Sequence, residues 1–202
     1  MKCNFITIER EYGSAGTKIA RRLSEVTGIP CYGREILEAV AERMNISVER
    51  VERYEETISK SLLYTIALLG QASSGSMASL APEDQVFLEE QEEIRRLAGK
   101  GPAIFLGHCA SGALKERKGV ATVFVRGKEA DKKARIMEDY QIPEADVEYT
   151  RRRYDKKRSN YYFANTAKHW ADLKNYDIVL DSSLLGIDGC VAVLKGLLAR
   201  EE

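Results

Sequence analysis

The sequence lacks three features that would assign it to a special class of protein: paired cysteines, net charge and a long apolar run. Its four cysteines (Cys3, Cys31, Cys109 and Cys190) are scattered, with no C-x-x-C pair. This spacing argues against a zinc site or a disulfide framework and suits a reducing compartment. We interpret Cys109 as a small buried hydrophobe, because no histidine-and-acid motif accompanies it.

The charges balance, with 31 Lys+Arg against 31 Asp+Glu, so no global field attracts nucleic acid or an anionic membrane. Any anion site must therefore be a local cluster. No stretch approaches the ~20 apolar residues of a membrane span, and Glu9 and Glu11 interrupt the only early apolar run. We expect a cytoplasmic protein without nucleic-acid or membrane partners, and a homo-oligomer stays possible.

Apolar runs alternate with helical patterns, which predicts an α/β fold in a single domain, residues 1–202. Most of the runs are continuously apolar, which favours a parallel sheet buried on both faces. Ligands of such sheets bind beyond the carboxyl ends of the strands. The expected strands are Asn4–Ile8, Pro30–Tyr32, Ala103–Leu106, Ala121–Val125 and Tyr176–Leu180.

The segment after the first strand has the pattern of a phosphate cradle. A loop of small residues, Gly13-Ser14-Ala15-Gly16, lies between that strand and a helix patterned by Ile19 and Leu23. Glycine lets the backbone approach an oxyanion, and N–H groups at the helix start point toward it. Lys18 stands one place later than in the pattern G-x-x-x-x-G-K-[ST], so an ordinary strand-to-helix turn remains an alternative.

Two insertions interrupt the alternation. The first, about residues 45–98, contains two expected helices within 46–70, capped by Asn45 or Ser47, then a small polar stretch at 72–79 and a helix from Pro82 to about Ala98. It either covers an acceptor or is a helical hairpin packed on the sheet.

The second insertion, about residues 143–169, reads as a helix with a strongly basic run. Arg151, Asp155, Arg158 and Tyr162 fall on one face of that helix. A basic run alone favours a solvated face, and a nucleic-acid stripe is a third alternative. Together with the glycine loop, the run favours a lid over a transferring phosphoryl group.

Several motifs resemble the cytidylate-kinase-like branch of the P-loop nucleoside monophosphate kinases over nearly the whole chain. Residues 10–16 are similar to R-E-Y-G-S-G-G, residues 32–37 to Y-D-[KR]-E-[IL]-[IL], and residues 107–111 to G-R-C-A-D. The most specific series runs from Asp155 to Ser183 and matches D-K-x-R-x-x-Y-Y…W…Y-D…[DN]-[ST]-S.

The resemblance implies a P-loop three-layer sandwich with a five-stranded parallel sheet, a helical acceptor-binding insertion and a basic helical lid. It also implies ATP, Mg²⁺ and phosphoryl transfer to a nucleoside monophosphate or a related small acceptor. The residues that we expect in the site fall into four groups, with Arg10 and Lys18 included for their nearness to the loop and not because the resemblance assigns them. They are Arg10, Gly13, Ser14, Ala15, Gly16, Thr17 and Lys18 for the ATP phosphates, Thr17 for the metal, Arg34, His108, Asp155 and Arg158 for the acceptor, and Arg151, Arg158 and Lys18 for catalysis.

The chain departs from the branch at Gly33, His108 and Ser111, where aspartate, arginine and aspartate are expected. An arginine and a histidine are not equivalent anion receptors, and we interpret His108 as a cap of the helix near Ala110. Lys18 is our first choice for the missing lysine charge, with Arg10 and Arg21 as alternatives. A nucleotide-binding regulatory protein with little turnover is the competing function.

Overall fold

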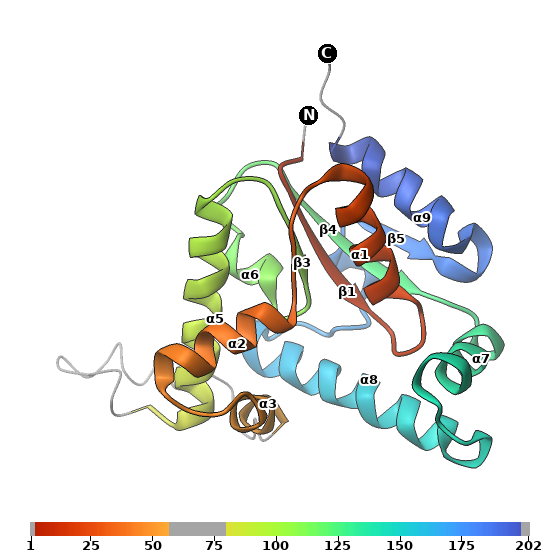
Figure 1. Ribbon diagram of the computed structural model, residues 1–202, viewed down its shortest axis with the longest axis horizontal. Coiled ribbons are helices and arrows are strands. Elements are labelled where there is room, and N and C mark those ends of the chain that lie inside the picture. Colours follow the sequence, from red (N-terminus) through yellow and green to blue (C-terminus); the bar gives the residue numbers. More distant parts are fainter. Residues whose placement is uncertain (1–2, 57–79, 199–202) are drawn as a thin grey trace.

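The computed structural model describes residues 3–56 and 80–198 (Figure 1). One five-stranded sheet has the order β2-β3-β1-β4-β5, and every neighbouring pair is parallel, which confirms the predicted sheet. The strands are β1 (Phe5–Arg10), β2 (Cys31–Tyr32), β3 (Ala103–Leu106), β4 (Val120–Arg126) and β5 (Ile178–Asp181).

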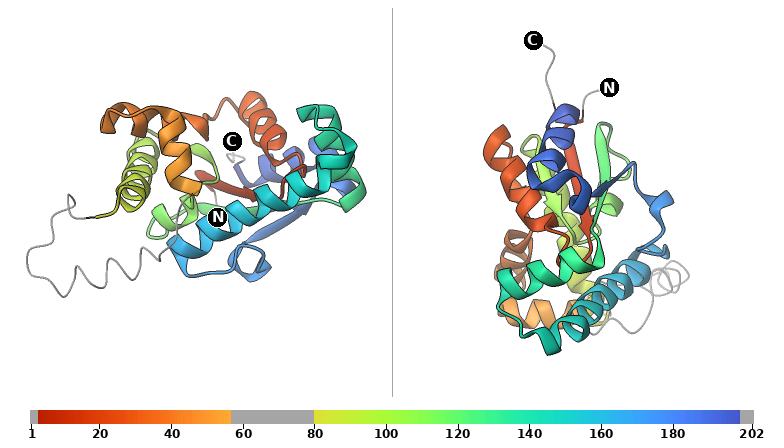
Figure 2. Two further views of the ribbon diagram at one scale, coloured as in Figure 1. Left: turned by 90° about the horizontal axis from the view of Figure 1, so that it is seen from below. Right: turned by 90° about the vertical axis from the view of Figure 1, so that its right-hand side faces the viewer.

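Helices lie on both faces of the sheet, as in the expected three-layer sandwich (Figures 1 and 2). They are α1 (Gly16–Thr27), α2 (Arg34–Met44), α3 (Val48–Glu56), α5 (Pro82–Gly99), α6 (Ala110–Ala113), α7 (Glu129–Tyr140), α8 (Glu144–Thr166) and α9 (Ser182–Leu198). None of the helices in the described ranges has the length and apolar character of a membrane span.

Successive side chains of β1 point to opposite faces of the sheet, and apolar residues on both sides explain why helices cover both faces. Ile6 and Ile8 pack with Leu23 of α1 and Leu194 of α9 on one face. Phe5 points to the other face, where it meets apolar residues of α5 and α6. Both sides of a central parallel strand are thus buried in apolar clusters.

The described part of the first insertion packs on the rest of the chain. Ser47 accepts a hydrogen bond from the Arg50 N–H at 3.3 Å, as expected of an N-cap, and Val51 of α3 packs beside Val40. The second half of α5 lies on the sheet through Ile94 and Leu97. The other expected helix and the small polar stretch fall within 57–79, outside the described residues.

Helix α8 crosses the carboxyl ends of the strands, below the sheet in Figure 1 and in front of the strand ends in the left view of Figure 2. An aromatic cluster anchors its last turns, because Tyr162 packs with Phe124 of β4 and with Trp170 and Tyr176. The Trp170 indole N–H also donates to the Glu9 carboxylate at 3.2 Å. The predicted second insertion is therefore a long helix held against the edge where ligands bind.

The turn between β1 and α1 leaves no room for a side chain at Gly13. This glycine has φ +80°, and a Cβ added there would lie 2.6 Å from the Lys132 carbonyl oxygen and 2.9 Å from Ile136 Cγ1. Gly28, at the end of α1, has φ +69°, but nothing lies within 4 Å of an added Cβ. A side chain at Gly28 would thus cause backbone strain alone, whereas a side chain at Gly13 would cause the same strain and also clash with its neighbours.

We expect Gly28→Ala to lower the free energy of unfolding by about 1–2 kcal/mol, the cost of a left-handed backbone with a side chain. Gly13→Ala should cost at least about 3 kcal/mol, because overpacking adds to the same strain. Urea denaturation of both variants measures the difference. An equal loss of stability in the two variants would show that α7 does not pack tightly against the loop at Gly13.

Candidate active site

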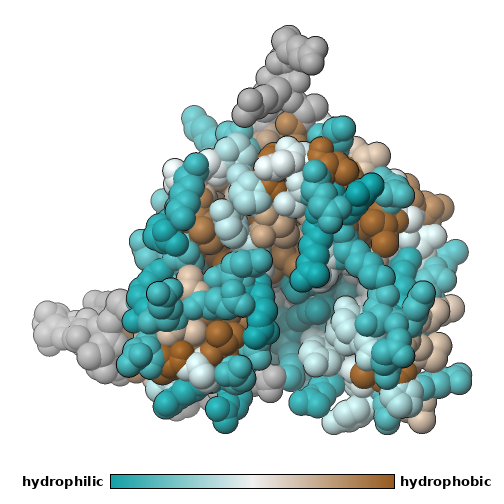
Figure 3. Space-filling model, viewed as in Figure 1, coloured by the Kyte–Doolittle hydropathy of each residue, from teal (hydrophilic) through white to brown (hydrophobic). Residues whose placement is uncertain are grey.

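A cavity of about 480 Å³ lies at the carboxyl ends of the strands. Residues from β1, α1, α2, α3, the β3–α6 loop and α8 line it, so segments far apart in the sequence meet there. Figure 3 shows a hollow below the centre of the molecule with mainly hydrophilic residues around it. The cavity has the position expected of a ligand site in a parallel sheet.

The glycine loop forms one side of this region. Ala15 has φ 63° and lies directly before α1, which begins at Gly16. The buried Ser14 hydroxyl donates to the Glu11 carbonyl at 2.8 Å and so closes the turn. The first N–H groups of α1 have no acceptor within the helix, which makes this end suited to an anion. Thr17 lines both the large cavity and a small one of about 20 Å³ at the loop.

Lys18 borders the small cavity at the glycine loop, together with Thr17. Its Nζ is 2.5 Å from Asp139 Oδ1, and its side chain is 51% exposed. The lysine that is nearest in sequence to the missing one is therefore paired with a carboxylate of α7, and it lines the small cavity but not the cavity of about 480 Å³.

Arg10 occupies the space beside Gly16. A Cβ added at Gly16 would lie 2.5 Å from Arg10 Cβ and 2.8 Å from its Cγ, and one added at Gly107 would lie 2.5 Å from Arg10 Nη1. The side chain thus runs from the loop across Gly107 into the wall of the cavity. Its buried Nε has no hydrogen-bond partner among the described residues.

Arg158 of α8 lies next to Arg10. Its Nη1 donates to the Arg10 carbonyl at 2.9 Å, and its guanidinium lies 5.6 Å from the centre of the Tyr12 ring. Burial, together with the charge of Arg10, lowers the pKa of Arg158 to about 10, and burial also lowers the pKa of Arg10. Both groups remain cationic at neutral pH, so their mutual repulsion favours binding of an anion between them.

The residues predicted to share one face of α8 have different partners. Asp155 accepts a hydrogen bond from the Tyr12 N–H at 2.7 Å and lies 3.7 Å from Arg158. Arg151 is enclosed by carboxylates, at 3.1 Å from Glu129, 3.0 Å from Glu148 and 3.5 Å from Asp155. The structure brings Arg158 to the cavity, whereas Arg151 joins α8 to α7.

A buried lysine that the sequence analysis did not identify joins α7 to the loop. Lys132 is 1% exposed, and its Nζ lies 3.0 Å from Glu11 and 2.7 Å from Glu129. Glu11 also accepts a hydrogen bond from the Gly127 N–H at 3.1 Å. The sequence shows Lys132 as one of several charges on an amphipathic helix, which gives no signal of its role.

Of the four acceptor residues expected from the resemblance, Asp155 and Arg158 thus lie on α8 beside the loop, whereas Arg34 and His108 line the cavity from α2 and from the β3–α6 loop. Arg34, at the start of α2, pairs with Glu52 at 2.8 Å and with Glu38 at 3.3 Å. Gly33, which replaces an aspartate, donates its N–H to the Glu35 carboxylate at 2.9 Å. Arg34 thus lines the cavity but already has two anionic partners.

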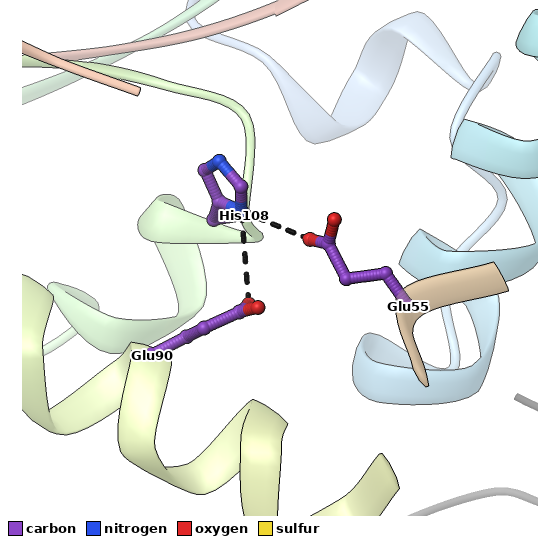
Figure 4. Close-up of side chains that lie close together, drawn as sticks. All are labelled: Glu55, Glu90 and His108. Carbon is purple, nitrogen blue, oxygen red and sulfur yellow. Dashed lines mark hydrogen bonds and ion pairs between the residues drawn. The ribbon is translucent and has the colours of Figure 1, made fainter. Parts of the chain in front are cut away.

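The interpretation of His108 as a helix cap is wrong. Cys109 is the residue before α6, and the His108 ring instead faces Glu55 of α3 and Glu90 of α5 (Figure 4). Its Nδ1 lies 3.0 Å from Glu55 Oε1 and 3.7 Å from Glu90 Oε2. The physical reason is charge, because two carboxylates in a buried setting attract the imidazolium more strongly than a helix end does.

The pKa values of both Glu90 and His108 are raised in this cluster, for different reasons. Burial, reinforced by the charge of Glu55, raises the pKa of Glu90. Burial disfavours the imidazolium, but the two carboxylates outweigh this effect and raise the pKa of His108. Neither acid can be recognised from the sequence, since Glu90, for example, is one of several acidic residues in α5. Cys109 is buried and packs among aromatic residues, as expected of a small hydrophobe.

If Arg158 is an anion receptor, Arg158→Ala should weaken binding of inorganic tripolyphosphate at least tenfold, since hydrogen bonds to charged groups contribute about 1.5–3 kcal/mol. Arg152→Ala is the matched control, because Arg152 lies on the same helix but is 75% exposed. Isothermal titration calorimetry at two salt concentrations compares them. An equal loss of tripolyphosphate affinity in the two variants would show that Arg158 contributes only through the overall positive charge of α8.

Comparisons with known proteins agree with this geometry. The model of the cytidylate kinase-like family matches residues 5–184. An uncharacterized protein from Eubacterium ventriosum has a similar structure, with TM-score 0.71 and 22% identity over 97% of this chain and 99% of that chain.

Two more distant structures share the fold. TT1252 from Thermus thermophilus has TM-score 0.55 and 17% identity over 99% of this chain and 100% of its own. Shikimate kinase from Bacteroides thetaiotaomicron has TM-score 0.51 and 12% identity over 96% of this chain and 97% of its own. No curated protein sequence matches the chain.

Proposed function

Because the chain belongs to the cytidylate kinase-like family, we propose that it transfers the γ-phosphoryl group of ATP to a small acceptor bound in the cavity. The observation that carries this proposal is the pair of adjacent, partly buried guanidinium groups, Arg10 and Arg158, beside the glycine loop. Phosphoryl transfer needs charge stabilisation more than covalent chemistry, and this pair supplies it where the loop meets the cavity.

The loop fits the triphosphate of a nucleotide. The start of α1 offers free N–H groups, and the tight packing around Gly13 and Gly16 holds the backbone in place. P-loop kinases generally use ATP with Mg²⁺, and Thr17 fits the metal because it lines the cavity at the loop. Mg²⁺ would neutralise charge on the phosphate oxygens, while Arg10 and Arg158 would orient the transferring group.

We assign the missing lysine charge to Arg10 in place of Lys18. The Lys18 ammonium at the loop is already paired with Asp139, whereas the Arg10 side chain fills the space that a side chain at position 16 would need, and its Nε has no hydrogen-bond partner among the described residues. The position of the Arg10 side chain therefore requires a glycine at position 16, because a larger residue there would occupy the same volume as Arg10.

The acceptor is a nucleoside monophosphate or a related small molecule. Lys157 lines the cavity and supports a phosphorylated acceptor, whereas Arg34, which also lines it, is already paired with Glu52 and Glu38. The pairing of His108 with two carboxylates argues against this residue as a phosphate receptor. The same pairing favours the second candidate function, a nucleotide-binding regulatory protein with little turnover.

The proposed function predicts that Mg-ATP raises the melting temperature of the protein. A ligand at 100 times its dissociation constant adds about 2.7 kcal/mol to stability. Radiolabelled γ-phosphate then reports transfer to each nucleoside monophosphate and to small hydroxyl compounds. Stabilisation with transfer supports the kinase, stabilisation without transfer supports the regulatory protein, and no stabilisation contradicts both.

Moving the positive charge tests the role of Arg10. Arg10→Gly should lower phosphoryl transfer at least about 100-fold, the effect of removing one donor to a transition-state oxyanion. Adding Gly16→Lys to Arg10→Gly should restore part of the rate, because glycine at position 10 frees the space beside position 16. Lys18→Ala is the control and should change the rate only a few-fold. A large loss of phosphoryl transfer in Lys18→Ala would assign the missing lysine charge to Lys18. No recovery of the rate in a folded Arg10→Gly, Gly16→Lys variant would likewise contradict the assignment to Arg10.

A further inference from the structure

The geometry of Glu55, Glu90 and His108 points to a binding site for one divalent transition-metal ion, separate from the proposed magnesium site. One ligand atom from each of the three residues lies within 4.8 Å of the other two. Among the described residues, no other group of three or more His, Cys, Asp or Glu has this proximity. Figure 4 shows both acidic side chains, one from α3 and one from α5, directed at the His108 ring.

The distances suit a small ion. Tetrahedral bonds of about 2.1 Å to nitrogen and oxygen separate the ligand atoms by about 3.4 Å. The observed separations from Nδ1, 3.0 Å to Glu55 and 3.7 Å to Glu90, bracket this value. An ion in the middle therefore needs only small movements of the three side chains.

An unpartnered oxygen provides an independent indication of a ligand. The Glu90 side chain is 0% exposed, and its Oε1 has no hydrogen-bond partner among the described residues. Its other oxygen accepts from the Tyr161 hydroxyl, which holds the carboxylate in place. A buried carboxylate oxygen without a partner is costly, and a cation bound at the Glu90 carboxylate would reduce that cost.

Charge also favours a dication. Two carboxylates and one imidazolium leave an excess negative charge in a buried setting, whereas two carboxylates, a neutral imidazole and a dication are neutral. Binding therefore displaces the proton between Nδ1 and Glu55. A mixed imidazole and carboxylate set suits zinc, manganese, iron or cobalt better than magnesium or calcium.

The elements around the cluster already fix its ligands. Gln91 donates to the His108 carbonyl at 2.9 Å and so holds the β3–α6 loop, where His108 has φ 56°. Tyr161 orients Glu90, as outer hydrogen bonds commonly orient metal ligands. Three protein ligands leave a coordination position open, and Glu55 and His108 line the cavity. That the open position would face the phosphoryl acceptor rests on the proposed function.

The experiment measures metal content and does not depend on kinase activity. Metal-stripped protein is dialysed against Zn²⁺ or Co²⁺, and bound ions per chain are counted by mass spectrometry. We expect one tightly bound ion, with a visible Co²⁺ absorption that lacks the thiolate charge-transfer band of a cysteine site. Glu55→Gln and Glu90→Gln should each weaken binding at least tenfold.

Glu52→Gln is the matched control, since Glu52 lies one turn before Glu55 in α3 and lines the same cavity. It should retain full metal binding. Glu55→Gln keeps the test valid if Glu90→Gln does not fold, because Glu55 is only partly buried. No stoichiometric binding, or binding that Glu55→Gln leaves unchanged, overturns the metal site. Mg-ATP stabilisation of the same samples shows separately whether the proposed nucleotide site is intact.

Discussion

Two hydrogen bonds between α8 and the end of β1 fix the geometry on which the candidate site depends. Asp155 accepts from the Tyr12 N–H, and Arg158 donates to the Arg10 carbonyl. Both partners in β1 and its loop are backbone groups, so the sheet itself sets the position of the helix. The basic face of α8 therefore lies across the carboxyl ends of the strands, and one wall of the cavity is cationic.

Charge is distributed unequally around this cavity. Arg10 and Arg158 lie side by side at the glycine loop, which concentrates positive charge there. On the side of α3 and α5, Glu55 and Glu90 enclose His108 and leave an excess of negative charge. The cavity thus offers surroundings complementary to an anion at one wall and to a cation at another.

The fold and part of the site could be predicted from the sequence, because both depend on local patterns. Continuous apolar runs predicted the parallel strands, and helical spacing predicted that Asp155 and Arg158 share a face. The path of Arg10 could not be predicted, since it depends on Gly16 and on Gly107, which is distant in sequence. Lys18 lies beside the loop, but its pairing with Asp139 could not be predicted, because that carboxylate lies in α7, far away in sequence.

The contacts of Lys132 connect the glycine loop to α7, so that the two segments are expected to move together. Its ammonium holds Glu11, and its carbonyl oxygen closes the space over Gly13. Arg151 in turn joins α8 to Glu129 of the same α7 helix. A displacement of α7 with α8 would consequently change the affinity of the loop for an anion bound there. By thermodynamic reciprocity, an anion bound at the loop biases the position of the two helices by the same free energy.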